Sequence, residues 1–168
     1  MERDRDNFKS LEKFEKMIQD DNTVYLDLNE LEEIIIYYFH DANYELAEKA
    51  IGLANQIFPK SINISILSSE ILIQKNKESE AYELINDCLN LNSENYDLIF
   101  QKAKILNKLK KYNDSNNLLF KLSKINETIF LVDDLMLRNY MNLDKYSKSI
   151  KVAKRLISQF PDDKKYMD

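Results

Sequence analysis

Residues 42–59 read A-N-Y-E-L-A-E-K-A-I-G-L-A-N-Q-I-F-P, and their main features return along the chain with a regular period of about 34 residues. The aromatic position recurs as Tyr44, Tyr112 and Tyr146, with Glu78 in the second copy. The closing dipeptide Phe58-Pro59 returns three periods later as Phe160-Pro161. The small-residue position recurs as Ala47, Ala81, Ser115 and Ser149. A period of this length predicts a stack of repeated helix pairs.

The composition favours the same fold class. One Gly and two Pro among 168 residues leave few helix breakers, so long helices with short connections are expected. The lone Cys88 cannot form an internal disulfide, and a reducing compartment is expected. The charged N-terminus contains no apolar signal-peptide core, and the longest apolar run, 34–39, is too short to span a membrane. We therefore expect an all-α cytoplasmic protein.

The periodic pattern resembles the tetratricopeptide repeat (TPR), and the resemblance covers about 136 of the 168 residues. The resemblance implies a right-handed solenoid of antiparallel helix pairs. The segments around 14–17, 25–27 and 32–38 also resemble the start of larger bacterial TPR proteins of unknown function. Glycine, which the family places where helix A crosses its partner, is replaced here by Ile35, Ser69, Ala103 and Leu137.

The expected organisation has three parts. Residues 1–27 form an N-terminal capping helix, near 7–20, and a short link in which Asp27 is the expected N-cap of the first repeat. Each repeat has a helix A and a helix B, near 28–40 and 44–57 in the first. Residues 164–168 begin a further helix or a tail. The four repeats are expected at 28–61, 62–95, 96–129 and 130–163.

The charge is unevenly distributed along the chain. Residues 1–95 hold 20 acidic and 9 basic residues, a net charge of −11, whereas residues 96–168 hold 9 acidic and 15 basic, a net charge of +6. The acidic N-terminal half disfavours nucleic-acid binding, which relies on neutralising phosphates. The split indicates that the two halves meet different partners, or each other.

The sequence offers little material for catalysis. His40 is the only histidine, and its place at a helix end beside Asp41 favours a capping or surface role over metal binding. Cys88 stands at a small-residue packing position, so we expect it to fill the core. A single Gly excludes Gly-rich phosphate loops. We expect no enzyme, no cofactor and no metal site.

The resemblance implies a binding groove lined by the A helices. Carried onto this chain, the family's groove positions include an apolar stripe and, in the C-terminal half, a basic cluster with nearby amides. The groove candidates are Ile36, Phe39, Ile66, Glu70, Ile73, Phe100, Lys104, Asn107, Lys108, Leu131, Arg138, Met141 and Asn142. The expected ligand is a peptide or amphipathic helix of a partner protein, with an acidic group over Lys104, Lys108 and Arg138.

Several alternatives stay open. The apolar stripe could equally pack against further repeats of a longer protein, and the basic cluster could be an ordinary solvated face. Binding of chaperone tails is disfavoured, since Glu32 and Ile36 stand where the family's clamp has Lys and Asn. The main alternative function is structural: homo-oligomerisation through the C-terminal end of the stack, or association with further repeats. No nucleic-acid or membrane partner is expected.

Overall fold

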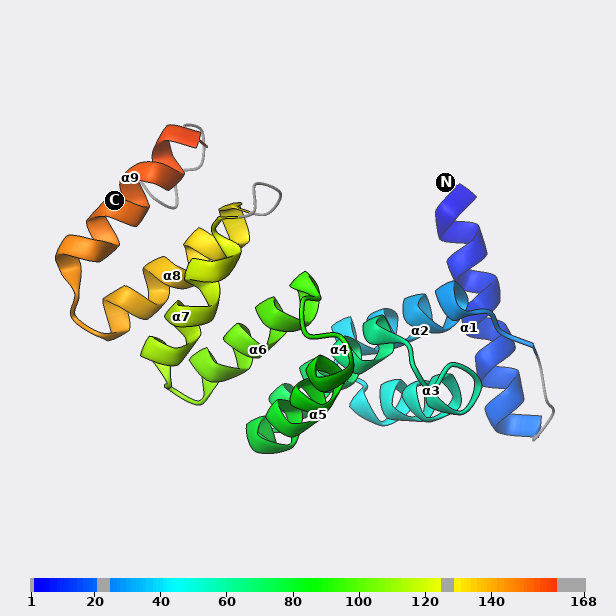
Figure 1. Ribbon diagram of the computed structural model, residues 1–168. Helices are drawn as coiled ribbons and strands as arrows, with labels where there is room; N and C mark the ends of the chain where they lie inside the picture. Colours follow the sequence, from blue (N-terminus) through cyan, green and yellow to red (C-terminus); the bar gives the residue numbers. More distant parts are fainter. Residues whose placement is uncertain (1, 21–24, 125–128, 160–168) are drawn as a thin grey trace. The chain divides into compact units, whose positions relative to one another are not determined.

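The computed structural model describes residues 2–20, 25–124 and 129–159. Every regular element in these residues is an α-helix, which confirms the predicted all-α fold (Figure 1). The chain divides into two compact units, Met1–Lys77 and Glu78–Asp168. Unit 1 contains α1 (Glu2–Asp20), α2 (Leu28–His40), α3 (Tyr44–Ile57) and α4 (Ile62–Gln74). Unit 2 contains α5 (Glu78–Leu91), α6 (Tyr96–Lys108), α7 (Tyr112–Leu122), α8 (Ile129–Asn142) and α9 (Tyr146–Gln159).

The helix starts follow the period found in the sequence. The helices α2, α4 and α6 begin at positions 28, 62 and 96, and α3, α5, α7 and α9 begin at 44, 78, 112 and 146. Both series advance by one sequence period at each step. The predicted bounds of the first helix pair, 28–40 and 44–57, agree with α2 and α3. The division into four repeats at the predicted boundaries, with its two terminal segments, stays a prediction, and residues 160–168 lie outside the described residues.

Side-chain caps start three of the A helices in the same way. Asp27 Oδ1 accepts from the Glu30 amide at 2.9 Å, and the Glu30 carboxylate accepts from the Asp27 amide at 3.0 Å, which completes a capping box. This confirms the predicted cap. Ser61 and Asn95 cap α4 and α6 through the amides of Ile64 and Leu98. Successive caps are one sequence period apart, so equivalent A-helix positions share one register.

A second periodic feature ends the A helices. Backbone φ is positive at Ala42, Asn76, Lys110 and Asp144, which again follow one another by one sequence period. The next residue in each turn donates its amide to the carbonyl oxygen five positions back, as from Asn43 to Tyr38 and from Lys111 to Leu106. This is the Schellman arrangement that satisfies the last helix carbonyls. Each A helix therefore ends in the same left-handed turn, although none of the four residues is Gly.

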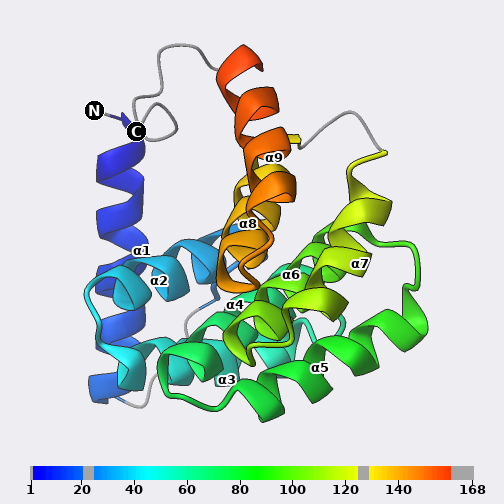
Figure 2. The ribbon, with the colours of Figure 1, turned by 90° about the vertical axis from the view of Figure 1, so that its left-hand side faces the viewer.

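The core of unit 1 lies between α1, α2, α3 and α4. Leu31, Ile34 and Ile35 of α2 are buried in it, together with the small residues of α3. The helix α1 lies beside α2 (Figure 2), and Phe14 is 1% exposed. The Tyr38 hydroxyl donates to Glu15 Oε1 at 2.8 Å, and burial, followed by this carboxylate, raises the pKa of Tyr38. The helix α1 thus covers one side of α2. It begins at Glu2, earlier than the predicted residue 7.

The core of unit 2 joins α6, α7, α8 and α9. Ala103, Leu119, Leu122, Val132 and Leu156 are buried at its centre. The pairs α6–α7 and α8–α9 are hairpins with short turns, and α7 packs against α8 (Figure 1). The helix α5 packs against α6. The stacking brings α6 and α8, the two A helices of this unit, next to each other.

The recurring small-residue position is buried throughout the described chain, at Ala47, Ala81, Ser115 and Ser149. In the α6–α7 hairpin the Ser115 hydroxyl donates to the carbonyl oxygen of Ala103 at 2.8 Å, so the two helices are in close contact. The expectation for Cys88 was wrong in degree. The Cys88 side chain is half-buried and does not fill the core. The residues that α5 buries completely are Ala81 and Ile85.

Candidate functional site

The predicted groove residues of unit 1 lie on α2 and α4, which pack against each other. Ile36 is 41% exposed, and Ile66 and Glu70 are half-buried. Phe39 is half-buried, and its ring makes edge contacts with His40 and Tyr44. Ile73 is only 5% exposed, so it offers almost no surface to a partner. In this unit Ile36 is therefore the principal exposed apolar residue of the predicted stripe.

The predicted apolar residues of unit 2 are more exposed. Leu131 and Met141 on α8 are 54% and 56% exposed, whereas Phe100 on α6 is half-buried against the core. Exposed apolar side chains on adjacent helices are a common feature of protein-binding surfaces when they lie close together. We call the surface formed by Phe100, Lys108, Leu131, Arg138 and Met141 the A-helix face of unit 2.

The predicted cations of unit 2 are less available than the sequence indicated. Arg138 Nη2 forms an ion pair with Asp134, one turn earlier on α8, although the Arg138 side chain remains 58% exposed. Lys104 is half-buried and has an interaction partner of its own. Lys108 is exposed at the end of α6. Among the described residues Lys108 has no carboxylate partner, so an incoming carboxylate would meet it directly, whereas at Arg138 it would compete with Asp134.

The predicted amides also have internal partners. Asn107 Nδ2 donates to Asn139 Oδ1 at 2.5 Å, and Asn142 Nδ2 donates to the Arg138 carbonyl oxygen at 2.9 Å. Asn107 is half-buried and Asn142 is exposed. The predicted residues of unit 2 thus lie on two adjacent helices, α6 and α8. The Asn107 side chain connects these helices through its hydrogen bond to Asn139.

Comparison with solved structures identifies the fold. A tetratricopeptide repeat protein from Parabacteroides merdae superposes with a TM-score of 0.75 at 16% identity, over 95% of this chain and 62% of that one. TTC0263, a TPR protein of Thermus thermophilus, gives a TM-score of 0.74 at 13% identity, over 94% of this chain and 84% of that one. The chain has the tetratricopeptide-repeat fold. The predicted TPR resemblance and solenoid class are therefore confirmed.

A third similar TPR structure is YrrB, described as having an unusual peptide-binding site. It superposes with a TM-score of 0.71 at 12% identity, over 97% of this chain and 82% of that one. Neither a protein-family model nor a curated protein sequence matches the chain. This chain spans less than two thirds of the length of the Parabacteroides protein.

A buried polar network, which sequence reasoning missed, supports the A-helix face of this TPR unit. Asn139 is 0% exposed and donates to Ser115 Oγ and Asn116 Oδ1, both at 2.9 Å, while it accepts from Asn107. The network connects α6, α7 and α8. One feature of the sequence indicates that Asn139 is buried. It follows the apolar Leu135 by four residues, and residues at this spacing lie on the same face of a helix. The partners could not be predicted, because they lie on two other helices.

A second missed interaction connects α8 to α9. Asp133 is 0% exposed, and both of its carboxylate oxygens accept from the guanidinium of Arg155. From the charge pattern alone, Arg155 is one surface cation among those of the C-terminal half. In the structure the Arg155 side chain is 44% exposed, but its guanidinium pairs with the fully buried carboxylate of Asp133.

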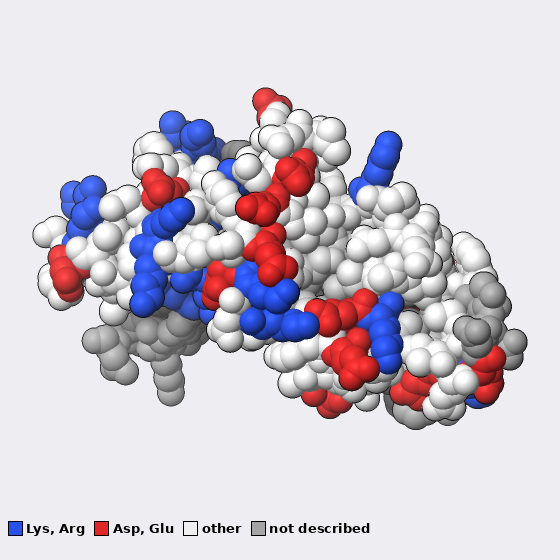
Figure 3. Space-filling view, turned by 90° about the horizontal axis from the view of Figure 1, so that it is seen from below, with Lys and Arg blue, Asp and Glu red and all other residues white. Residues whose placement is uncertain are grey.

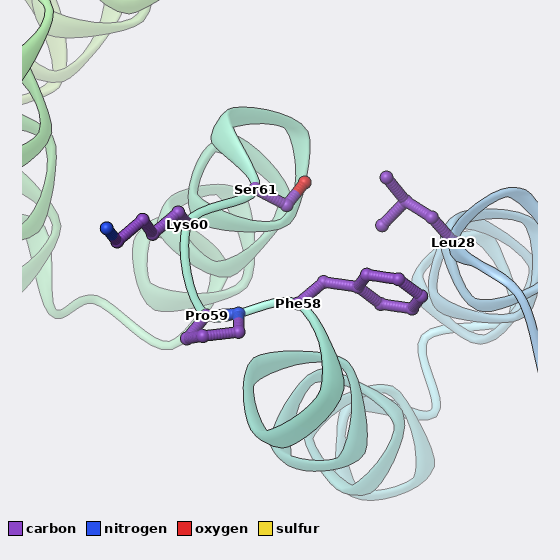
Figure 4. Close-up of a pocket in the computed structure, with 5 residues that line it drawn as sticks. All are labelled: Leu28, Phe58, Pro59, Lys60 and Ser61. Atoms are coloured by element: carbon purple, nitrogen blue, oxygen red, sulfur yellow. The ribbon is translucent and has the colours of Figure 1, made fainter.

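An apolar pocket of about 350 Å³ lies in unit 1 at the turn between α3 and α4. Figure 4 shows the Phe58 ring directed towards Leu28, whereas Lys60 points away from both. Pro59 and Ser61 complete the lining. No predicted site residue lines this pocket.

Two further observations concern metal ligands and membrane-spanning helices. In the described parts of the chain, no three His, Cys, Asp or Glu side chains come together as metal ligands would. Among the same residues, no helix combines the length and apolar character needed to cross a membrane.

Proposed function

We propose that this chain is a non-catalytic cytoplasmic TPR scaffold that binds a peptide or helix of a partner protein through its A helices. The observation that carries the proposal is the exposure of Leu131 and Met141, at 54% and 56%, on a helix adjacent to α6. Each buried Å² of apolar surface contributes about 25 cal/mol to association before the costs of ordering. A partner that covers both side chains would gain from this burial.

The charge of the A-helix face favours a partner that is acidic where it meets unit 2. Lys108 is exposed at the end of α6, and the Arg138 guanidinium remains 58% exposed while paired with Asp134. A partner carboxylate beside an apolar side chain would therefore find both complementary charge and apolar contact. YrrB, a solved structure of the same fold with a peptide-binding site, supports a peptide ligand for this chain.

The test is a pull-down from a lysate of the source cells with three matched baits. They are the wild-type chain, the face variant Lys108→Glu/Leu131→Ser/Met141→Ser, and the control Lys124→Glu/Leu91→Ser/Phe120→Ser. Leu91 and Phe120 are 82% and 58% exposed and lie on α5 and α7, so the control removes comparable apolar surface and changes the same charge. We expect a protein that wild type and control retain and the face variant loses. Equal capture by all three baits would contradict the proposal.

A structural role remains the second candidate, and the surface of α9 favours it. This helix contains no acidic residue, and Lys148, Lys151 and Lys154 are exposed together with Ile150, which is 54% exposed. In Figure 3, Lys and Arg side chains gather over the left part of the view, where the helices of unit 2 lie. The acidic first 95 residues of a second copy offer a complementary charge.

Light scattering of the purified chain at low and high salt tests this second candidate. Oligomerisation through α9 predicts a dimer or larger species that dissociates with salt and in a Lys148→Glu/Lys151→Glu/Lys154→Glu variant. Arg155 is left intact because it pairs with Asp133. A monomer whose mass does not depend on concentration or salt would remove the structural candidate.

A further inference from the structure

A cleft in unit 2 lies outside the A-helix face. It has a volume of about 270 Å³ and lies between α5, α6 and α7. Leu89, Ile99 and Leu118 give it an apolar lining, and Lys102 and Lys121 add two cations. At 100° per residue, Ile99 and Lys102 lie roughly 140–160° around α6 from Lys104, so they face a different direction from the predicted groove residues. We call this site the α5–α7 cleft.

Lys102 is held in place at the edge of the cleft. Its Nζ donates to Asn86 Oδ1 at 2.5 Å and lies 5.0 Å from the centre of the Tyr82 ring. Lys111 approaches the same ring at 6.0 Å, which adds a second positive charge nearby. A surface lysine normally loses side-chain freedom when it binds a ligand, and this loss weakens binding. For Lys102, much of this ordering is present before any ligand arrives.

The charges of the cleft are unbalanced. Among the described residues, no acidic side chain lines it. In the described residues, neither Lys102 nor Lys121 forms an ion pair with a carboxylate. An ammonium group has three donors, and Asn86 accepts from only one of those of Lys102. The cleft therefore offers positively charged donors beside three apolar side chains, a combination that complements a carboxylate next to an apolar group.

We propose that the α5–α7 cleft is a second binding site of this chain and takes a protein segment that carries an apolar side chain beside a carboxylate. The volume supports a side-chain ligand, because it lies below the roughly 300–1,000 Å³ of sites for drug-sized molecules. A leucine-sized group would contact Leu89, Ile99 and Leu118, while the adjacent carboxylate accepts from Lys102 and Lys121. The chain could then hold two protein segments at once, one on each side of α6.

The test uses the full chain and the capped peptide Ac-Glu-Glu-Leu-Glu-Glu-Leu-Gly-NH2 as the probe. Affinity is measured by calorimetry, and the binding residues are identified from the backbone amide shifts of the isotope-labelled protein. Two further peptides replace every Glu by Gln or every Leu by Ala. The cleft variant is Lys102→Gln/Lys121→Gln. The matched control is Lys16→Gln/Lys60→Gln, which makes the same charge change in unit 1, outside the cleft.

We expect the acidic peptide to shift amides around Leu89 and Leu118, with equal affinity for the wild type and the unit 1 control. The cleft variant should bind at least about tenfold more weakly, since it lacks the two charged donors that the peptide carboxylate would accept from. Both altered peptides should also bind more weakly. Equal binding by the cleft variant, no saturable binding, or shifts confined to Lys108 and Leu131 would overturn the proposal. The variant Leu131→Ser/Met141→Ser separates the two sites, because it should keep cleft binding while it loses any binding at the A-helix face.

Discussion

Asp133 and Arg155 form a two-point ion pair that joins α8 to α9. Arg155 donates through Nε and Nη2 to the two carboxylate oxygens of Asp133, which is completely buried, while the Arg155 side chain is 44% exposed. The pair holds α9 against the helix that presents Leu131 and Met141. It therefore connects the stability of the last helix pair to the geometry of the A-helix face.

Removing one member of this pair should destabilise the chain. Arg155→Ala leaves a buried carboxylate without its cation, and we expect the free energy of unfolding to fall by about 2–3 kcal/mol, because Arg155 itself is partly solvated. Urea unfolding followed by circular dichroism measures the change. Lys154→Ala, an exposed neighbour, should stay within about 0.5 kcal/mol of the wild type. A loss for Arg155→Ala no larger than for Lys154→Ala would contradict this role.

The buried amide of Asn139 makes a second stability prediction. Asn139→Leu should lower the free energy of unfolding by about 2 kcal/mol or more, since Asn107, Ser115 and Asn116 each lose a hydrogen-bond partner in or near the core. The matched control is Asn142→Leu, which changes an exposed amide that, among the described residues, bonds within its own helix. If the two variants unfold at the same urea concentration, the network does not stabilise the helix stack.

The left-handed turns predict stabilising substitutions. Positive φ costs a residue other than Gly about 1–2 kcal/mol, and the extra freedom of Gly in the unfolded chain offsets a part of this difference. Lys110→Gly and Ala42→Gly should therefore raise the unfolding free energy by about 0.5 kcal/mol or more. Asn76→Gly should gain less, because Asn tolerates this conformation better. Thermal unfolding provides the measurement, and a loss of stability in both Lys110→Gly and Ala42→Gly would show that other contacts of these residues matter more.

Tyr38 predicts a loss of stability at alkaline pH. Burial and the hydrogen bond to Glu15 raise the pKa of Tyr38 above its usual 10.0, so the folded state keeps the phenol proton longer than the unfolded state. The contribution of Tyr38 to the free energy of unfolding is complete below pH 10.0. It is lost as the pH rises above this value, at about 1.4 kcal/mol per pH unit. Tyr38→Phe should make the decline shallower. Part of the decline should remain, because the pKa values of two other tyrosines are also raised. Burial raises the pKa of Tyr96, and the hydrogen bond to Asp144 raises that of Tyr146. An equally steep decline in Tyr38→Phe would contradict this assignment.

The local features of the fold could be read from the sequence because they repeat. The small residues Ala47, Ala81, Ser115 and Ser149 are all buried, and Asp27 caps α2 as predicted. Their positions depend on contacts within one helix pair or one turn, which the sequence period records directly. The left-handed turns were missed because Ala42 and Lys110 carry no residue-type signal for positive φ.

The candidate site was only partly predictable, because its charges depend on packing. Asp134 and Arg138 are four residues apart on one helix, so their ion pair was readable from the sequence. Asp133 and Arg155 meet only after α8 and α9 pack together, and Asn139 finds its partners on α6 and α7. The α5–α7 cleft likewise combines residues of three helices, and no single stretch of sequence predicts it.

Site-specific photo-crosslinking in the source cells tests the proposed binding mode most directly. A photoreactive phenylalanine analogue is placed at Leu131 or Met141 on the A-helix face, and at Leu91 or Phe120 as exposed controls. We predict that Leu131 and Met141 crosslink to the same partner protein, and that both crosslinks disappear in the Lys108→Glu background while the controls give no such product. Crosslinks to that partner from Leu91 and Phe120 alone would show that the chain does not bind through its A helices.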